Sequence, residues 1–227
     1  MAIKNTNLGG TDWAADEKLA SADLNDTFDA AYNVLQTLST FWLNSDLYSE
    51  YENFNSESTG AISSNTNWTF SGTTSIVEST NAGGETKELY IHAASTGAAN
   101  SYAETKLLDD NRHTFCRVYA QVRATGSITD ANVQAGFAKD SNYYNIITIA
   151  SSGSGQYISC LSCIHVINTG DGAYDLYIGG KKVASYSGVS ASDAQLQIRC
   201  DVDGGGGDTA QAIAYIDDIR QSAYDVN

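Results

Sequence analysis

Residues 115–123 decide the fold, because in Phe115-Cys-Arg-Val-Tyr-Ala-Gln-Val-Arg123 apolar and polar side chains alternate along the whole stretch. One face of this segment carries small apolar side chains, namely Cys116, Val118, Ala120 and Val122. The opposite face carries Arg117, Tyr119, Gln121 and Arg123. A period of two is typical of a β-strand with one buried face. The segment therefore predicts a strand of a sheet that packs one side on a core.

The same alternation recurs in Leu196-Gln-Ile-Arg-Cys-Asp-Val-Asp203, where every second residue from Leu196 to Val202 is apolar. Further short segments between turn residues complete residues 61–227, and Gly179-Gly180 marks a tight hairpin. The expected strands are Trp68–Ser71, Glu88–His92, Tyr102–Leu107, His113–Ala124, Asn132–Ala138, Tyr143–Ala150, Gln156–Ile167, Tyr174–Ile178, Lys182–Ser187, Ala194–Val202 and Thr209–Arg220. Many strands without helical segments predict an all-β fold, an antiparallel jelly-roll sandwich.

One N-terminal amphipathic helix is expected before the sandwich, over residues 21–44. Ser21 is a good N-cap, and the apolar positions that follow are spaced by alternating steps of 4 and 3 residues. These positions are Leu24, Phe28, Ala31, Leu35, Leu38 and Trp42. The spacing leaves two readings open. The helix packs on its own domain, or it forms a self-associating stalk, for which the wide apolar face favours a homotrimer.

These patterns divide the chain into four parts. The expected parts are an extended attachment peptide over residues 1–20, the helix over 21–44, a connector over 45–60 and the β domain over 61–227. The connector is acidic and polar, with three aromatic residues, Tyr48, Tyr51 and Phe54. We expect these rings to pin the start of the β domain.

Charge and composition narrow the classes of partner. The 227 residues contain 12 Lys and Arg against 27 Asp and Glu, a formal net charge of −15. This charge argues against a nucleic-acid partner and against an anionic membrane surface. The apolar stretches are too short to span a bilayer, and residues 1–10 lack the apolar core of a secretory signal.

The cysteines predict no metal site. Cys160-Leu-Ser-Cys163 has the C-x-x-C spacing of a zinc knuckle or a redox pair. Its surroundings predict a strand, on which residues three apart face opposite sides and so cannot chelate one ion. Buried thiols are therefore favoured over a metal site.

Catalytic patterns are not found, so we expect no enzymatic activity. The sequence contains no E-x-D-x-x-E string of the kind that lectin-fold glucanases use, no G-x-S-x-G and no phosphate-binding loop. Asp217 and Asp218 are adjacent, so strand alternation predicts that they face opposite sides.

Two candidate binding sites remain. Tyr143 and Tyr144 follow Asp140-Ser-Asn142 in an expected loop, so Asp140, Asn142, Tyr143 and Tyr144 are candidates for contact with a sugar. The alternative is one tyrosine in the core and one on the surface. Asp201, Asp203 and Asp208 surround the glycine run 204–207 and are candidate calcium ligands. A solvated acidic loop is the other reading, and we expect no further cofactor.

Two phrases resemble known sandwich families. Ala212-Ile-Ala-Tyr-Ile-Asp-Asp-Ile-Arg220 resembles the last strand of concanavalin A-like and carbohydrate-module jelly rolls. The hairpin Tyr174-Asp-Leu-Tyr-Ile-Gly-Gly-Lys-Lys-Val-Ala-Ser185 resembles a hairpin of laminin G-like sandwiches. Both resemblances imply the fold more than a ligand.

The N-terminal phrase Gly10-Thr-Asp-Trp13, followed by Leu19-Ala-Ser-Ala-Asp-Leu-Asn-Asp-Thr-Phe-Asp-Ala30, looks like the head of phage tail-fibre and other virion proteins. It departs from them at Ala14-Ala-Asp-Glu-Lys18, where a glycine-containing turn is common. The resemblance implies localisation to the virion, other virion proteins as partners, and an outward β domain.

The sequence thus predicts a virion structural protein, a fibre, spike or capsid decoration, that adheres to a neutral host glycan. The alternative is a carbohydrate-binding module or lectin-like surface protein outside any virus. A glycoside-cleaving enzyme is the third hypothesis.

Overall fold

The computed structural model describes residues 48–65, 67–83, 86–96, 100–107, 113–125, 128–137, 142–152, 156–170, 172–190, 195–203 and 209–222. The chain forms two compact units, residues 1–48 and 49–227, and the second unit is the one described below. The expected peptide over 1–20 and helix over 21–44 lie outside the described residues. The six apolar positions from Leu24 to Trp42, and the oligomer expected from them, therefore remain predictions.

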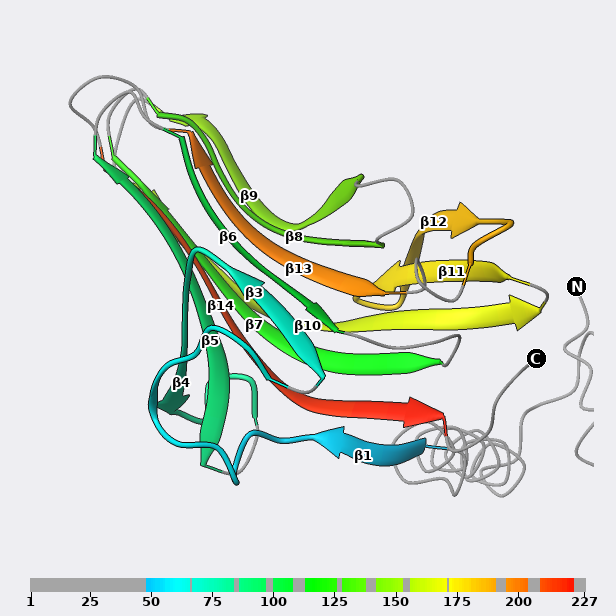
Figure 1. The fold of residues 1–227 in the computed structure, drawn as a ribbon. Coiled ribbons are helices and arrows are strands. Elements are labelled where there is room, and N and C mark those ends of the chain that lie inside the picture. Colours follow the sequence, from blue (N-terminus) through cyan, green and yellow to red (C-terminus); the bar gives the residue numbers. More distant parts are fainter. Residues whose placement is uncertain are drawn as a thin grey trace, which may run out of the picture. The chain divides into compact units, whose positions relative to one another are not determined.

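The second unit is built from two β-sheets that lie one over the other (Figure 1). The larger sheet has the strand order β12 (Lys181–Tyr186), β11 (Ala173–Ile178), β10 (Gln156–Gly170), β7 (Thr114–Ala124), β14 (Thr209–Ser222), β5 (Lys87–Thr96), β4 (Thr73–Glu78), β2 (Gly60–Ala61), and β1 (Tyr48–Glu52) also pairs with β14. The smaller sheet has the order β3 (Trp68–Ser71), β6 (Asn100–Leu107), β13 (Leu196–Asp203), β8 (Ile128–Phe137), β9 (Tyr143–Ser152). Figure 1 shows β8 and β9 bending, with the outer face of the smaller sheet on the inside of the bend.

The connections repeatedly change sheet. From β5 the chain crosses to β6, returns to β7, and crosses again to β8, and it does so once more from β12 through β13 to β14. The strand pairs from β2 to β14 with a recorded register are antiparallel. This exchange between two sheets is the connectivity of a jelly-roll sandwich. The all-β prediction is confirmed for the described residues, which contain no helix.

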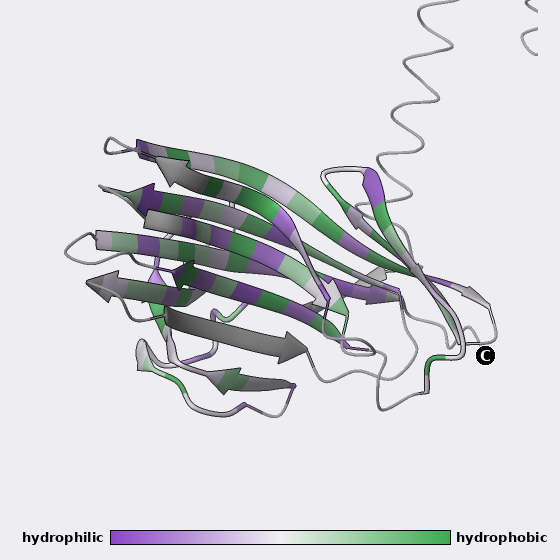
Figure 2. Cartoon of the chain, turned by 90° about the horizontal axis from the view of Figure 1, so that it is seen from above, coloured by the Kyte–Doolittle hydropathy of each residue, from purple (hydrophilic) through white to green (hydrophobic). Residues whose placement is uncertain are grey.

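The core lies between the sheets and follows the predicted alternation. In β7, the four residues Cys116, Val118, Ala120 and Val122 are fully buried. In β13, the inward residues are Leu196, Ile198, Cys200 and Val202. Figure 2 shows the resulting alternation of hydrophobic and hydrophilic residues along the strands. The two segments that predicted the sandwich therefore supply opposite sides of its core.

Of the three connector rings expected to pin the start of this unit, Phe54 does so, and the side chains of Tyr48 and Tyr51 lie outside those described. Phe54 is fully buried, and its ring centroid lies 6.0 Å from that of Trp68. The connector also contains a strand of the sheet, because β1 lies within residues 45–60 and pairs with β14. No helix in the described ranges is long and apolar enough to cross a membrane.

The cysteines behave as strand residues. All four are free, with Cys116 and Cys200 buried and Cys160 and Cys163 half-buried. Cys160 packs against the core, whereas Cys163 lies near Arg117 and Asp218. Burial and Asp218 raise the pKa of the Cys163 thiol, and Arg117 opposes them only in part. The predicted opposite orientation of the C-x-x-C pair is therefore confirmed, and zinc binding by this pair stays untested.

One prediction about β14 is wrong. The β14–β7 register shifts between Asp217 and Arg220, so one extra residue is inserted in β14. At this bulge Asp218 has φ of 50°, in the left-handed region that Asp and Asn tolerate better than most residues. Its carboxylate does not turn to the opposite side from Asp217, because it pairs with Arg117, the residue opposite Asp217 in the register.

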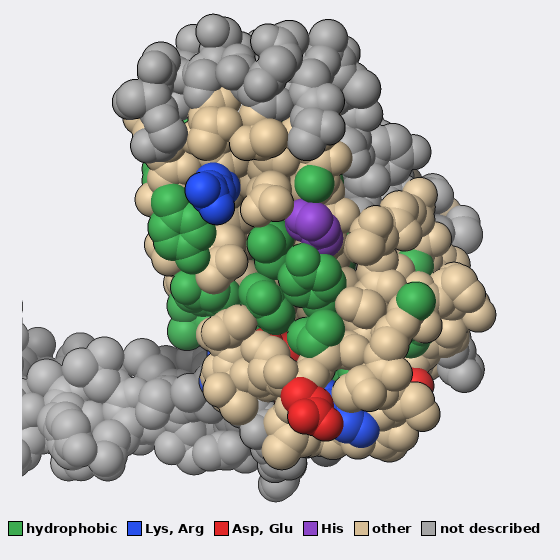
Figure 3. All heavy atoms as spheres, turned by 90° about the vertical axis from the view of Figure 1, so that its left-hand side faces the viewer, with side chains coloured by type: hydrophobic (Ala, Val, Ile, Leu, Met, Phe, Trp, Pro, Cys, Tyr) green, Lys and Arg blue, Asp and Glu red, His purple; other side chains and the backbone are tan. Residues whose placement is uncertain are grey.

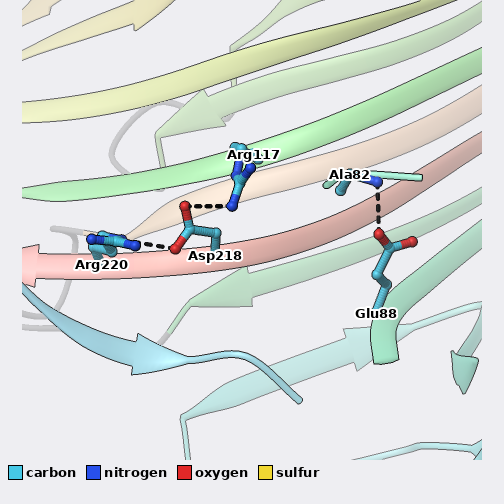
Figure 4. A network of polar contacts seen from close by, with 5 residues as sticks. All are labelled: Ala82, Glu88, Arg117, Asp218 and Arg220. Atoms are coloured by element: carbon cyan, nitrogen blue, oxygen red, sulfur yellow. Dashed lines mark hydrogen bonds and ion pairs between the residues drawn. The ribbon is translucent and has the colours of Figure 1, made fainter. Parts of the chain in front are cut away.

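The bulge organises a charged cluster at one end of the larger sheet (Figure 4). The two carboxylate oxygens of Asp218 lie 2.8 Å from Arg117 Nη2 and 2.7 Å from Arg220 Nε. Beside them, the fully buried Glu88 accepts a 2.6 Å hydrogen bond from the Ala82 backbone N–H. Asp217 is also buried, at 1% exposure, and burial raises its pKa to about 7. The cluster ties the β4–β5 loop to the sheet.

Candidate functional site

The outer face of the smaller sheet is polar and aromatic, and it contains Tyr143, the most promising residue of the predicted sugar-contact group. Inward residues alternate with outward ones, and the strands β8, β9 and β13 supply the part of this face around Tyr143. The outward residues are Asn132 and Gln134 from β8, Tyr143, Asn145 and Thr148 from β9, and Gln197, Arg199, Asp201 and Asp203 from β13. We call these nine residues the polar face.

Tyr143 can lie across the sheet because Gly136 stands opposite it in β8. A Cβ atom on Gly136 would lie 2.5 Å from the Asn142 carbonyl oxygen and 3.0 Å from Tyr143 Cδ1. Both distances are shorter than van der Waals contact. The missing side chain therefore lets the tyrosine ring lean over β8 toward β13.

On β13 the ring meets Arg199. The guanidinium carbon of Arg199 lies 5.0 Å from the centroid of the Tyr143 ring, a cation–π geometry. The same guanidinium lies 3.3 Å from Asp201 Oδ2. Burial alone lowers the pKa of Arg199, but Asp201 and the Tyr143 hydroxyl outweigh burial and raise that pKa. The unit Tyr143–Arg199–Asp201 therefore has no net charge, since the aspartate balances the guanidinium.

Amide and hydroxyl groups extend the polar face away from this unit. Gln134 Nε2 donates a 2.9 Å hydrogen bond to Asn145 Oδ1, and Thr148 Oγ1 donates to Asn132 Oδ1. Both pairs join β8 to β9 beside the bulge at Ile146, where the register shifts. Gln197 is 2% exposed and so belongs to the floor of the face. The two hydrogen bonds hold amide groups of β8 and β9 beside the Tyr143 unit.

The predicted sugar-contact residues separate in the structure. Tyr143 is on the polar face, whereas Tyr144 is half-buried and packs against the core. Asn142 is exposed beside Tyr143, and Asp140 lies outside the described residues. The arrangement is the alternative that alternation offered, with one tyrosine inward and one outward. Sequence patterns did not single out Arg199, Gln134 or Asn145, although the alternation in β13 indicated that Arg199 points outward.

The predicted calcium ligands are only partly placed. Asp201 is paired with Arg199, Asp203 lies at the end of β13, and Asp208 is outside the described residues. Within the part of the chain that the structure describes, no three His, Cys, Asp or Glu side chains are grouped to hold a metal ion. Asp130 faces the same end, and burial raises its pKa, with Asp201 and Asp203 adding to the effect while Asn132 opposes it. Calcium binding stays a prediction.

No protein-family model matches the sequence, and no curated protein matches it. Among solved structures, a sialidase is 13% identical with a TM-score of 0.38, over 80% of this chain and 19% of that chain. This chain therefore spans about a fifth of the length of that sialidase.

Two other solved structures are matched over nearly their whole length. TmCBM61 in complex with β-1,4-galactotriose is 12% identical with a TM-score of 0.29, over 78% of this chain and 98% of that chain. A family 16 endo-glucanase from Bacteroides ovatus is 8% identical with a TM-score of 0.35, over 75% and 98%. These TM-scores are below 0.5, so the fold is inferred from the strand pairing above and no functional argument rests on these similarities.

Changing Gly136 to alanine is expected to disrupt the Tyr143–Arg199 contact. The added Cβ forces Asn142 and Tyr143 to move, which we expect to reduce the free energy of unfolding by about 1 to 3 kcal/mol. Denaturant unfolding measures the loss. Gln134→Ala, on the neighbouring outward position, is the control and is expected to cost less than about 1 kcal/mol. Equal stability of the Gly136→Ala variant and the unchanged chain would contradict the close packing.

Proposed function

We propose that the β domain is a carbohydrate-binding sandwich that recognises a neutral glycan on its polar face. The observation that carries the proposal is the Tyr143–Arg199–Asp201 unit, in which an aromatic ring is held across the sheet by a charge-balanced pair. A sugar has one apolar face for such a ring and hydroxyl groups that bind amide and carboxylate side chains. The rows of Asn and Gln residues beside the ring supply those partners.

Charge supports a neutral ligand at this site. The net charge of −15 repels polyanions at long range, and the guanidinium of the polar face is already neutralised by Asp201. A neutral sugar meets neither effect. Recognition then depends on shape, stacking and hydrogen bonding, and we expect a single site to have a Kd near 1 mM, about −4 kcal/mol.

Biological binding at that affinity needs several sites. Self-association through residues 21–44 would present several polar faces and raise the avidity by about 10²–10⁴ without new contacts. Light scattering of the intact chain tests this part. A monomer of 24 kDa at micromolar concentration would remove the avidity argument but leave the polar face unaffected.

Attachment to a virion is the finer part of the proposal and rests only on the resemblance of residues 10–30 to phage proteins. The alternative, a carbohydrate-binding module outside any particle, uses the polar face in the same way. Mass spectrometry of purified particles separates the two, because a virion protein is found there at structural copy number. Release of reducing ends from a bound glycan would instead identify the glycoside-cleaving enzyme of the third hypothesis.

Replacing Tyr143 by alanine is expected to weaken binding to neutral glycans at least about tenfold. Loss of the ring removes the stacking surface and frees Arg199 from its cation–π contact. A glycan array with the intact chain identifies the ligand, and calorimetry with that ligand measures Kd for the variants. Tyr143→Phe keeps the ring and is expected to retain most binding, while Tyr177→Ala, on β11 of the other sheet, is the matched control. Unchanged binding by Tyr143→Ala would overturn the proposed site.

A further inference from the structure

A second concave site lies on the opposite side of the sandwich, on the outer face of the larger sheet. A pocket of about 380 Å³ opens there between β7, β10 and β14. Its principal lining residues are Gln121, Arg123, Gln156, Tyr157, Gln211 and Ile213. Pockets of about 300 Å³ and above are of the size that holds small ligands.

Strand register explains why these side chains meet. Arg123 of β7 stands between Tyr157 of β10 and Gln211 of β14. One step along β7, Gln121 stands between Ser159 and Ile213 in the same way. The pocket therefore has a cation and an amide at its centre, and each is flanked by one apolar and one polar neighbour.

The charge of Arg123 distinguishes this pocket from the polar face. Arg117, Arg199 and Arg220 each pair with an aspartate, but none of the described ion pairs involves Arg123, which is exposed. No carboxylate belongs to the lining of this pocket. In a chain with a net charge of −15, the pocket thus offers a guanidinium without a partner acid.

The apolar wall of the pocket is provided by Tyr157 and Ile213. Tyr157 is 61% exposed, one of the most exposed large apolar side chains in the described residues. Figure 3 shows hydrophobic side chains gathered on this side of the molecule, with a basic side chain beside them. The neighbouring rings of Tyr90, Tyr119 and Tyr215 are tilted against one another by 44° to 60°, so they pack together and form no flat platform. The accessible ring is that of Tyr157.

We propose that this pocket binds a single carboxylate-bearing sugar of an acidic glycan. The planar guanidinium of Arg123 matches a carboxylate with two parallel hydrogen bonds. Gln156 and Gln211 bind hydroxyl groups, and the apolar face of the sugar ring lies against Tyr157. A polyanion is disfavoured because the net charge of the chain repels it, whereas one acidic unit on a neutral chain is repelled little.

Titration of the intact chain with methyl β-glucuronide and with methyl β-glucoside tests this proposal, because the two probes differ at the carboxylate. Saturation-transfer NMR gives Kd for each. We expect the glucuronide to bind about 10- to 100-fold more tightly, and Arg123→Gln to abolish the difference. Arg123→Lys keeps the positive charge but lacks the planar group that makes two parallel hydrogen bonds. This variant is expected to retain only part of the difference in Kd between the two probes. Circular dichroism confirms that each variant is folded.

The two sites are separable because they lie on different sheets. Tyr143→Ala is expected to leave glucuronide binding unchanged, so failure of the neutral-glycan proposal does not affect this test. Equal Kd values for the two probes, or glucuronide binding that Arg123→Gln does not change, would overturn the proposal. Sulfate competing as strongly as glucuronide would also overturn it, since the pocket would then be a general anion site.

Discussion

Replacing Asp218 by alanine is expected to lower the free energy of unfolding by about 3 kcal/mol. The carboxylate of Asp218 is 11% exposed and holds two guanidinium groups, those of Arg117 and Arg220. Removing it leaves two positive charges close together and partly buried, which costs far more than loss of a surface ion pair. Chemical denaturation at pH 7 measures the change.

Asp218→Asn distinguishes the effect of losing the charge from the effect of the unusual backbone conformation at this position. Asparagine tolerates the φ of 50° as well as aspartate does and keeps an oxygen that accepts one hydrogen bond. We therefore expect a smaller loss, about 1 to 2 kcal/mol. If the asparagine variant loses no stability while the alanine variant does, the bulge conformation rather than the charge cluster is responsible.

Asp217→Asn is expected to stabilise the protein, by an amount that increases with pH. Burial raises the pKa of Asp217 from 3.8 to about 7, so the folded state holds its proton while the unfolded state releases it. Stability contributed by this group is complete below pH 4 and is lost as the pH rises toward 7. The asparagine variant does not titrate, and its advantage should increase from near zero at pH 4 to about 2 to 4 kcal/mol at pH 8.

The difference in unfolding free energy between Asp217→Asn and the unchanged chain, measured from pH 4 to pH 8, is the quantity to compare. Taking a difference cancels the titration of the other carboxylates, such as Asp175, whose pKa the partner Lys182 lowers despite the opposing effect of burial. Asp175→Asn serves as a control: because the pKa of Asp175 is lowered, its titration lies below pH 4, and the loss of stability in this variant should be nearly constant from pH 4 to pH 8. A constant difference across this pH range would show that Asp217 is ionised in the folded protein.

Alternation was sufficient to predict the inward and outward faces of β7 and β13. In a regular strand, the side on which a residue lies depends only on whether its position is odd or even. The alternation failed at Asp218, where one inserted residue reverses the sides on which the following side chains lie. Nothing in the local sequence indicates the insertion. Alternation also missed β4, whose first residues, Thr-Thr-Ser, resemble a turn and form a strand only by pairing with β5.

The candidate site could be predicted only in part for a related reason. Tyr143 and Arg199 are separated by 56 positions and meet because β13 pairs with β8 and β8 pairs with β9. No pattern within one strand contains that pairing order. The pocket around Arg123 was invisible for the same reason, since its residues come from three strands that are distant in the sequence.

The position of β14 has a consequence for synthesis on the ribosome. Residues 209–222 fill the gap between β5 and β7 in the larger sheet, although those two strands are made about 100 residues earlier. Until β14 emerges, β5 and β7 each present an unpaired edge with apolar residues on one side, the condition under which nascent chains associate wrongly. Closure of the larger sheet therefore waits until residues 209–222 have left the ribosome, and chaperone binding during elongation would act on these two edges.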